Sequence, residues 1–489
     1  MDSDNSKLGI NSILSISARG SELISLVFIH FMLTRYLGAS DFGLYAFAIS
    51  FVMVFYPIID LGMDHIFVRE INKDKSSTCE IFYSTILLKF VILLPTIIII
   101  ACGIHFISPD RNLFWGIIIE GIATLLVRQF FCIIARAFFV AFEELKYDLT
   151  LSLISQITKI LILLIVVYLD MGFIAVFFVI LGGDLVYGLP GTIIALSRYL
   201  SKREQSRKDV TEDLKSKINK IKKMLIETLP VGLTLILITA SFHIDVFIIK
   251  HFLNDEKNGI FAAAYRIIAT LISCSVPVIW VMMPLLSRSA KTNTLARELQ
   301  KGMKFILLLS IPLITGLFFF AETIVSFFGE DFKESAYVLK FLVIVLIFRF
   351  IGYLFDLALI AMDKQKLTII GSTSLFIVNL TLDFLLIKHY DIYGACIGTL
   401  AADISTCILL YILLKSNLDG FYIFKIIVKP IIAAIIFVAW MRMTGDFNLI
   451  LSFSGGFLIY CLCIYFFKIL NDEEIAFFKK LSGKFVIRK

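Results

Sequence analysis

Long apolar runs recur from one end of this chain to the other, and they constrain its fold more than any other feature. A typical run holds about twenty residues, which as an α-helix covers a hydrocarbon core about 30 Å thick. Hydrophobic residues make up 59% of the chain and charged residues only 17%, against roughly a quarter charged in soluble domains. The sequence therefore predicts an all-α integral membrane protein and excludes the water-soluble classes.

The runs predict about fourteen transmembrane helices. An even number of spans places both termini on the same side of the membrane. The eight cysteines lie mostly inside the runs without paired spacing, which indicates apolar fillers. The predicted spans are residues 12–33, 42–64, 81–107, 113–140, 149–169, 173–196, 225–249, 260–287, 303–327, 336–361, 367–387, 393–414, 429–443 and 449–467.

The basic residues sort by side of the membrane. If the N-terminus is cytoplasmic, the inner loops and tails carry about 30 Lys and Arg and the outer loops about 6. The net charge of +7 is therefore the signature of cytoplasmic anchoring, and it does not indicate a nucleic-acid partner. We expect both termini in the cytoplasm and contacts with membrane lipids.

The chain also resembles itself. The segment YLGASDFGLYAFA from Tyr36 matches FLNDEKNGIFAAA from Phe252 at an offset of 216 residues. AFEELK from Ala141 matches AMDKQK from Ala361 at an offset of 220. Gly172 matches Gly394 at an offset of 222, and Asp184 pairs with Asp403 across a small gap. The matches fall at equivalent places in two sets of six spans. Because six is even, the two copies have the same orientation and are related by an axis along the membrane normal, as in transporters with parallel repeats.

This repeat predicts four parts of the chain. Residues 1–200 form an N-terminal lobe of six spans, and residues 201–224 form a basic cytoplasmic linker. Residues 225–415 form a C-terminal lobe of six spans. Residues 416–489 hold two further spans and a cytoplasmic tail.

At the first repeat the residues become recognisable. The segments TRYLGASDFGLYAFAISF, residues 34–51, and DLGMDHIFVREINKDKS, residues 60–76, resemble the N-terminal signature of the polysaccharide transporter family, which contains the Wzx-type O-antigen flippases. AFEELK resembles it less strongly, and the rest of the chain resembles it in the number and spacing of spans. The resemblance implies the fold of the multidrug, oligosaccharidyl-lipid and polysaccharide exporter (MOP) superfamily, in which two six-helix lobes open alternately to each side.

The resemblance also implies a function and partners. The cargo is an oligosaccharide repeat unit on undecaprenyl pyrophosphate, carried from the cytoplasmic to the periplasmic leaflet of the bacterial inner membrane for lipopolysaccharide synthesis. An O-antigen polymerase and a chain-length regulator are the implied protein partners. No resident cofactor is implied, and H⁺ or Na⁺ is the candidate coupling ion.

Ionisable residues inside spans are costly, so they are candidates for function. The candidate cations for the phosphates are Arg19, Arg266, Arg128, Lys159 and Arg349. Arg19 and Arg266 lead because they lie in spans of opposite lobes, where the related lipid II flippases carry cavity arginines, and because arginine offers forked donors to phosphate oxygens. Two alternatives remain open: Glu22, three residues after Arg19, could simply neutralise it, and Asp356 could form an internal ion pair with Arg349.

A membrane-buried carboxylate can change its charge with an ion gradient. The candidates for ion coupling are Glu22, Asp184, Asp245, Asp356, Asp383 and Asp403. A further set at the inner end of the second predicted span, Asp60, Asp64, Arg69 and Glu70, indicates a cytoplasmic gate or a helix-end charge network. His243 and Asp245 lack a third neighbouring ligand, so no metal site is expected.

Other readings of the sequence stay open. The same architecture could carry lipid II, an exopolysaccharide, a teichuronic acid or a drug. A membrane enzyme such as an O-antigen polymerase belongs to a different class and usually needs a large outer loop for its catalytic groups. Every predicted outer loop here is about ten residues or fewer, which favours a transporter over an enzyme.

Overall fold

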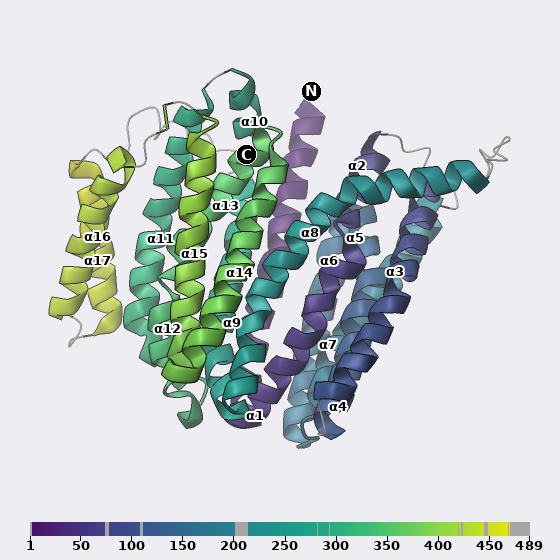
Figure 1. Ribbon diagram of the computed structural model, residues 1–489, viewed down its shortest axis with the longest axis horizontal. Coiled ribbons are helices and arrows are strands. Elements are labelled where there is room, and N and C mark those ends of the chain that lie inside the picture. The colour runs from purple at the N-terminus through teal and green to yellow at the C-terminus, as the bar shows by residue number, and fades with distance from the viewer. Residues whose placement is uncertain are drawn as a thin grey trace. The chain divides into compact units, whose positions relative to one another are not determined.

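The computed structural model describes residues 2–73, 78–107, 111–200, 214–280, 282–292, 294–418, 420–421, 424–444, 448–467 and 469, and every regular element in these ranges is a helix (Figure 1). The chain forms two compact units, Met1–Lys250 and His251–Lys489, called unit 1 and unit 2 below. The boundary lies within one helix, whereas the sequence predicts a linker at 201–224. Residues 201–213 of that linker and nearly all of the tail lie outside the described residues.

Unit 1 begins with a long helix that bends at Gly38, where φ is 69° and ψ is 177°. A π-helical stretch then joins two α-helices into one span, Arg111–Ala141. The elements of unit 1 are α1 (Asp2–Asp60), α2 (Met63–Lys73), α3 (Thr78–Ile107), α4 (Arg111–Gly121), the π-helix η2 (Ile122–Cys132), α5 (Ile133–Ala141), α6 (Leu145–Tyr168), α7 (Ala175–Ala195), η3 (Leu196–Leu200) and most of α8 (Leu214–Phe252).

Unit 2 begins at the end of α8 and ends in an additional helical pair. Its elements are α9 (Asp255–Trp280), α10 (Met283–Lys291), α11 (Leu295–Ser326), the 3₁₀ turn η5 (Glu330–Phe332), α12 (Ser335–Leu342), α13 (Val345–Ala361), α14 (Gln365–Tyr390), α15 (Ile392–Lys415), α16 (Phe424–Thr444) and α17 (Leu449–Phe466). The added pair, α16 and α17, packs on α11, where the Tyr460 hydroxyl donates to the Leu308 carbonyl at 3.1 Å.

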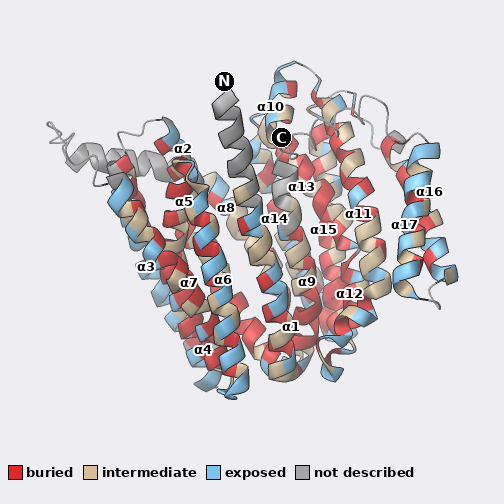
Figure 2. Cartoon of the chain, turned by 180° about the vertical axis from the view of Figure 1, so that it is seen from behind, coloured by how far each residue is buried: buried red, intermediate tan, exposed pale blue. Residues whose placement is uncertain are grey.

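Twelve helices among the described residues are long and apolar enough to span a membrane. The first of them, Ser17–Asp60, covers most of the first two predicted spans, which are joined through the bend at Gly38. The predicted span 260–287 falls on α9 and α10 and is not among the twelve. Exposed residues run along outer helices such as α3 and α17, and buried residues gather where helices of one unit pack together (Figure 2). This matches an all-α membrane fold.

Backbone conformation supports the internal repeat. Glu143 and Asp363 both have left-handed conformations, with φ of 58° and 60°, in the AFEELK and AMDKQK turns. Asp170 and Asp391 do the same after the next helix of each unit, with φ of 47° and 58°. Positive φ is uncommon outside glycine, so its recurrence at matching turns is a specific likeness between the two copies.

Candidate functional site

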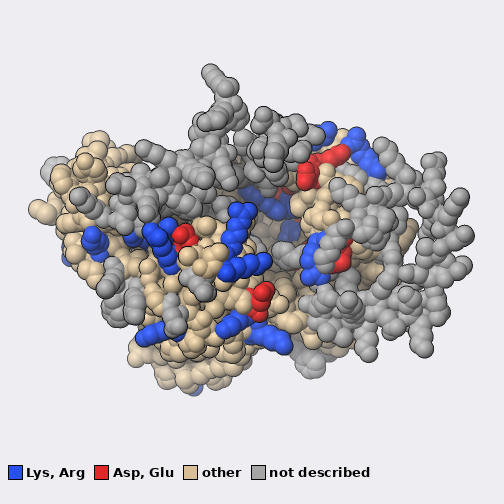
Figure 3. Space-filling view, turned by 90° about the horizontal axis from the view of Figure 1, so that it is seen from above, with Lys and Arg blue, Asp and Glu red and all other residues tan. Residues whose placement is uncertain are grey.

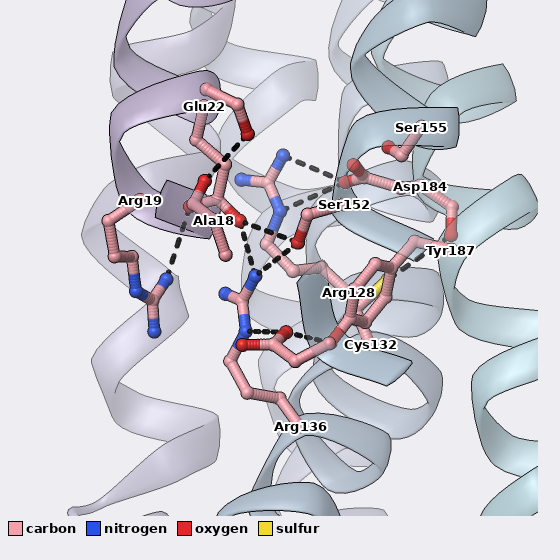
Figure 4. A network of polar contacts seen from close by, with 12 residues as sticks. Ala18, Arg19, Glu22, Arg128, Cys132, Arg136, Ser152, Ser155, Asp184 and Tyr187 are labelled. Carbon is pink, nitrogen blue, oxygen red and sulfur yellow. Dashed lines mark hydrogen bonds and ion pairs between the residues drawn. The ribbon is translucent and has the colours of Figure 1, made fainter. Parts of the chain in front are cut away.

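Charged side chains inside the spans of unit 1 form a network, drawn in Figure 4. Arg136 of α5 is at its centre: Nε lies 3.0 Å from Asp148 Oδ1, and Nη2 contacts Glu22. Asp148 also accepts a hydrogen bond of 2.6 Å from the Tyr187 hydroxyl. Helices α1, α5, α6 and α7 are thus joined through one guanidinium group.

Glu22 bridges two cations. Its Oε2 lies 3.1 Å from Arg19 Nη1, three residues earlier on α1, and its Oε1 contacts Arg136. The pairing of Arg19 with Glu22 was one of two alternatives left open by the sequence, and it is present. The Arg19 side chain is nevertheless 46% exposed, so it keeps donors for another partner.

Asp184 of α7 is the second bridging carboxylate. Arg128 donates to Oδ2 from Nε at 2.9 Å and Nη2 at 2.8 Å, and Lys159 Nζ lies 2.7 Å from Oδ1. Gly183 makes this possible, because a Cβ there would lie 2.2 Å from Lys159 Cγ. Glu120 is fully buried, accepts from Thr124 at 2.7 Å, and attracts Arg128 from a greater distance.

The π-helix η2 determines how Arg128 is presented. The amide of Ile133 donates to the Arg128 carbonyl, which is an i to i−5 bond. Such π-helical turns are rare and recur at functional sites, since they shift the residues before them relative to those after. The same helix contributes Gln129, and the span it belongs to contributes Arg136.

A third cluster lies at the junction of α1 and α2, where the sequence predicts a gate. Asp60 and Asp64 both contact Lys89 of α3, at 3.3 and 2.9 Å, whereas Arg69 and Glu70 pair with each other at 2.9 Å. Asp60 and Asp64 therefore share Lys89, and Arg69 and Glu70 contact each other. Loss of hydration and the nearby Asp60 carboxylate raise the pKa of Asp64 to about 7, although Lys89 acts in the opposite direction.

Unit 2 carries a simpler arrangement. Arg349 of α13 contacts Asp403 of α15, with Nε–Oδ1 at 2.5 Å and Nη2–Oδ2 at 2.6 Å, and both side chains are at most 6% exposed. The alternative pairing of Arg349 with Asp356 is wrong. Seven residues along a helix is about 10 Å, and the neighbouring helix offers a nearer carboxylate. Asp356 Oδ1 is buried with no hydrogen-bond partner among the described residues.

The remaining candidates are more dispersed. Asp383 is fully buried in α14 and accepts a hydrogen bond of 2.8 Å from Asn379. Asp245 of α8 is also fully buried, and Arg266 of α9 is half-buried. His243 Nδ1 lies 3.0 Å from Ser50 Oγ, and the described residues contain no group of side chains suited to a metal ion.

The sequence did not single out Arg136, Asp148, Lys89 or Gln129 as site residues. Arg136 and Lys89 belong to the in-span cations, which was the available signal. Their partners come from other helices, between 12 and 114 residues away, so spacing along one helix could not find them.

Two family models match the chain over more than half of its length. Residues 10–290 match the family described as polysaccharide biosynthesis protein, and residues 154–466 match the family described as lipid II flippase MurJ. The two matched ranges overlap and together cover nearly all the spans.

Two curated relatives are similar over a shorter stretch. The probable low-salt glycan biosynthesis flippase Agl15 of Haloferax volcanii is 26% identical over 159 residues, and a protein of Shigella flexneri named as an O-antigen transporter is 22% identical over 158. Each match covers 32% of this chain and about a third of the relative, 34% and 38%. Their names are those of transporters, as the sequence predicts.

Solved structures share the fold over most of the chain. The lipid II flippase MurJ in an inward closed conformation matches with a TM-score of 0.69 at 18% identity, covering 94% of this chain and 98% of that one. An inward-facing multidrug resistance MATE transporter of the MOP superfamily matches with a TM-score of 0.62 at 12% identity, covering 81% and 95%. The chain belongs to the polysaccharide biosynthesis protein family and has the fold of the MOP superfamily transporters.

Proposed function

We propose that the protein translocates an undecaprenyl-pyrophosphate-linked O-antigen oligosaccharide from the cytoplasmic to the periplasmic leaflet by alternating access. The observation that carries the proposal is the pair of bridging carboxylates in unit 1. Glu22 is shared by Arg19 and Arg136, and Asp184 is shared by Arg128 and Lys159. A carboxylate shared by two cations leaves N–H donors for a second anion.

Pyrophosphate suits this arrangement chemically. Its oxygens accept the same forked, charge-assisted hydrogen bonds from arginine that a carboxylate accepts. The cargo can therefore replace Glu22 or Asp184 as the partner of Arg19 or Arg128, so that no cation is left unpaired inside the membrane. The sugars need polar contacts while they cross, whereas the lipid tail can stay in the bilayer.

Ion coupling follows from the same exchange. Once the pyrophosphate has become the partner of the cations that Glu22 or Asp184 held, the released carboxylate can take up a proton or Na⁺. In unit 2, Asp356 is the strongest candidate for H⁺ or Na⁺, because a carboxylate without a partner is costly inside a membrane unless an ion neutralises it. Asp245, Asp383 and Asp403 remain further candidates.

The charge distribution supports a cytoplasmic position for one face. In the view of Figure 3, Lys and Arg are more prominent than Asp and Glu among the described side chains. Arg288 and Lys291 lie in the last turn of α10. By the excess of basic residues on cytoplasmic loops, we propose that this face lies in the cytoplasm of a cell with the protein in its inner membrane.

A complementation assay tests the cation assignment. We expect Arg19→Ala, Arg266→Ala and Lys159→Met to abolish or strongly reduce surface polysaccharide while the protein still accumulates in the membrane. Arg442→Ala is the matched control, because Arg442 is exposed in the last turn of α16, and it should keep wild-type polysaccharide. Wild-type levels from both Arg19→Ala and Arg266→Ala would disprove the role of these cations.

Lipid II is the second candidate cargo. It is favoured by the match of residues 154–466 to the lipid II flippase family. Depletion of the protein distinguishes the two: accumulation of an undecaprenyl-linked O-antigen unit at the inner leaflet supports our proposal, and accumulation of lipid II supports the alternative.

Coupling is tested separately in proteoliposomes. We expect transport of the lipid-linked oligosaccharide to fall when the proton and sodium gradients are both collapsed. Undiminished transport under these conditions would rule out the carboxylates as coupling groups, although it would leave the cargo assignment intact.

A further inference from the structure

The junction between α1 and α2 is a tight elbow. Helix α1 ends at Asp60, Leu61 and Gly62 have left-handed φ of 44° and 76°, and α2 begins at Met63. Asp60 Oδ2 accepts a hydrogen bond of 3.1 Å from the Gly62 amide, which fixes the turn. Helix α8 lies directly against it, since a Cβ on Gly232 would approach Leu61 Cα to 2.8 Å. The elbow therefore has no room for a shift of its backbone.

Lys89 of α3 contacts the two acidic side chains of this elbow, Asp60 and Asp64. Its side chain is fully buried, and its ammonium lies 2.9 Å from Asp64 Oδ1, 2.9 Å from Gln129 Oε1 and 3.3 Å from Asp60 Oδ1. The ammonium donates hydrogen bonds to Asp64 and Gln129, whereas Asp60 Oδ1 lies at ion-pair distance and is buried without a hydrogen-bond partner among the described residues. Gln129 is itself fixed by its amide, which donates to the Tyr56 carbonyl at 3.2 Å.

The charges of this cluster do not balance. Asp60 and Asp64 carry two negative charges against one positive charge on Lys89. Among the described side chains around it, none supplies a second cation in contact with the two carboxylates: Tyr56 is neutral at physiological pH, Arg69 contacts Glu70 on α2, and Arg128 and Arg136 contact other acids. A buried excess charge is costly unless an ion neutralises it.

We infer that Asp60, Lys89 and Asp64 form a proton-binding site, in which Asp64 takes up one proton near neutral pH and so keeps the elbow packed against α8. Asp64 is the acceptor because its side chain is 27% exposed and water can reach it, whereas that of Asp60 is 9% exposed. Asp60 Oδ2 is also fixed by the Gly62 amide, and Asp60 Oδ1 is buried beside the Lys89 ammonium. This inference goes beyond the proposed function, since it concerns a proton site that exists whatever the cargo is.

The direction of the pH effect follows from the charge. The raised pKa of Asp64 means that the folded elbow favours its protonated form. Stability from this site is therefore complete below the ordinary Asp pKa of about 4, is lost as the pH rises from there to about 7, and does not change further at higher pH. One proton linked to opening weakens the closed elbow about tenfold per pH unit between these two values.

Hydrogen–deuterium exchange of α2, residues 63–73, measures this opening in the purified full-length protein in nanodiscs. After correction for intrinsic exchange rates, we expect wild-type protection to fall about tenfold per pH unit between about pH 5 and 6.5 and to be constant above about pH 7.5. Asp64→Asn removes the excess charge, so its protection should not depend on pH. Arg69→Gln is the control on the same helix and should keep the wild-type profile.

Two outcomes would overturn the inference: protection of wild-type α2 that does not change between pH 5 and 7, or a pH dependence that persists in Asp64→Asn. Infrared difference spectroscopy gives a second measurement that does not depend on opening. A carboxylic acid band that titrates near pH 7 in the wild type and is missing in Asp64→Asn supports the site. The absence of such a band in the wild type contradicts it.

Discussion

The two units carry the same ion pair in different surroundings. In unit 1, Arg128 of the π-helix η2 binds Asp184 of α7, and in unit 2, Arg349 of α13 binds Asp403 of α15. The arginines are 221 residues apart and the aspartates 219, close to the offsets of the internal repeat. The same pair therefore joins the fourth span to the sixth in both copies.

The difference lies in what surrounds each pair. Asp403 contacts Arg349 and neither member of that pair is more than 6% exposed, whereas Asp184 contacts two cations and Arg128 is 27% exposed. A pair that is closed off from water is suited to holding two helices together. A shared and partly hydrated pair can exchange partners. The comparison teaches that the same Arg–Asp ion pair can stabilise helix packing in one copy of the repeat and be a candidate binding group in the other.

Breaking the unit 2 pair should have the largest effect. Asp403→Asn leaves the Arg349 guanidinium buried without a counter-charge, which typically costs about 3–5 kcal/mol. We expect a large loss of thermal stability in detergent and low amounts of protein in the membrane. The double substitution Arg349→Met with Asp403→Leu should recover much of this loss, because it removes both charges. Asp403→Asn protein with wild-type stability would contradict this stabilising role.

The equivalent change in unit 1 sharpens the comparison. Asp184→Asn also removes an acid, but Arg128 and Lys159 keep some access to water and Arg128 keeps the attraction of Glu120. We expect a loss of about 2 kcal/mol, smaller than for Asp403→Asn in the same thermal assay. Equal losses at the two positions would mean that the shared carboxylate is no more exchangeable than the closed one.

A substitution at Gly183 tests why Lys159 can contact Asp184 as a second cation beside Arg128. A Cβ at this position would lie within 2.2 to 2.8 Å of three carbons of the Lys159 side chain, so Gly183→Ala should displace the ammonium from Asp184. Overpacking of this kind costs about 1–3 kcal/mol, and we expect the low end because the lysine stem can move. Lys159→Ala in the same chain should relieve the strain, and thermal unfolding of the single and double variants measures both effects. A Gly183→Ala protein as stable as the wild type would show that α7 can yield here.

Much of this fold could be predicted from the sequence, because apolar runs and the distribution of Lys and Arg report directly on membrane spans. The internal repeat was equally accessible, and the pairing of Asp184 with Asp403 across a gap identified the two aspartates described above. The hydrogen-bond and ion-pair partners of the charged residues could not be predicted from the sequence. Arg136 meets Glu22 across 114 residues and Lys89 meets Gln129 across 40. Only helix packing brings such residues together, and single-sequence periodicity carries no information on which helices touch.

One misassignment shows the same limit. Asp356 lies two turns after Arg349 and was a reasonable partner by spacing on one helix. The arginine instead reaches Asp403 on α15, because a charge in a helix interface is nearer to the facing helix than to a residue about 10 Å along its own. The π-helix also escaped prediction, since no residue in 122–132 is a helix breaker.

The smallest expected effect concerns a charge cluster outside the membrane core of unit 2. Lys257, near the start of α9, contacts Glu334 at 2.8 Å and Asp391 at 3.0 Å. Partial burial acts against its charged form, but the hydrogen bonds from Lys257 to these two carboxylates outweigh it and raise the pKa of Lys257. Its contribution to stability is therefore complete at neutral pH and is lost only as the pH rises through that raised value.

Because all three side chains are 28 to 39% exposed, Lys257→Met should cost no more than about 1 kcal/mol at pH 7. Thermal unfolding of the variant and the wild type at pH 7 and at strongly alkaline pH measures the difference, which should shrink at the higher pH as the wild-type lysine loses its proton. Lys333→Met provides the control, since Lys333 forms an exposed pair with Glu330 close by. A loss of thermal stability in Lys257→Met as large as that in Asp403→Asn would mean that a partly hydrated cluster stabilises helix packing as much as the buried pair does. The contrast between exchangeable and closed pairs would then be wrong.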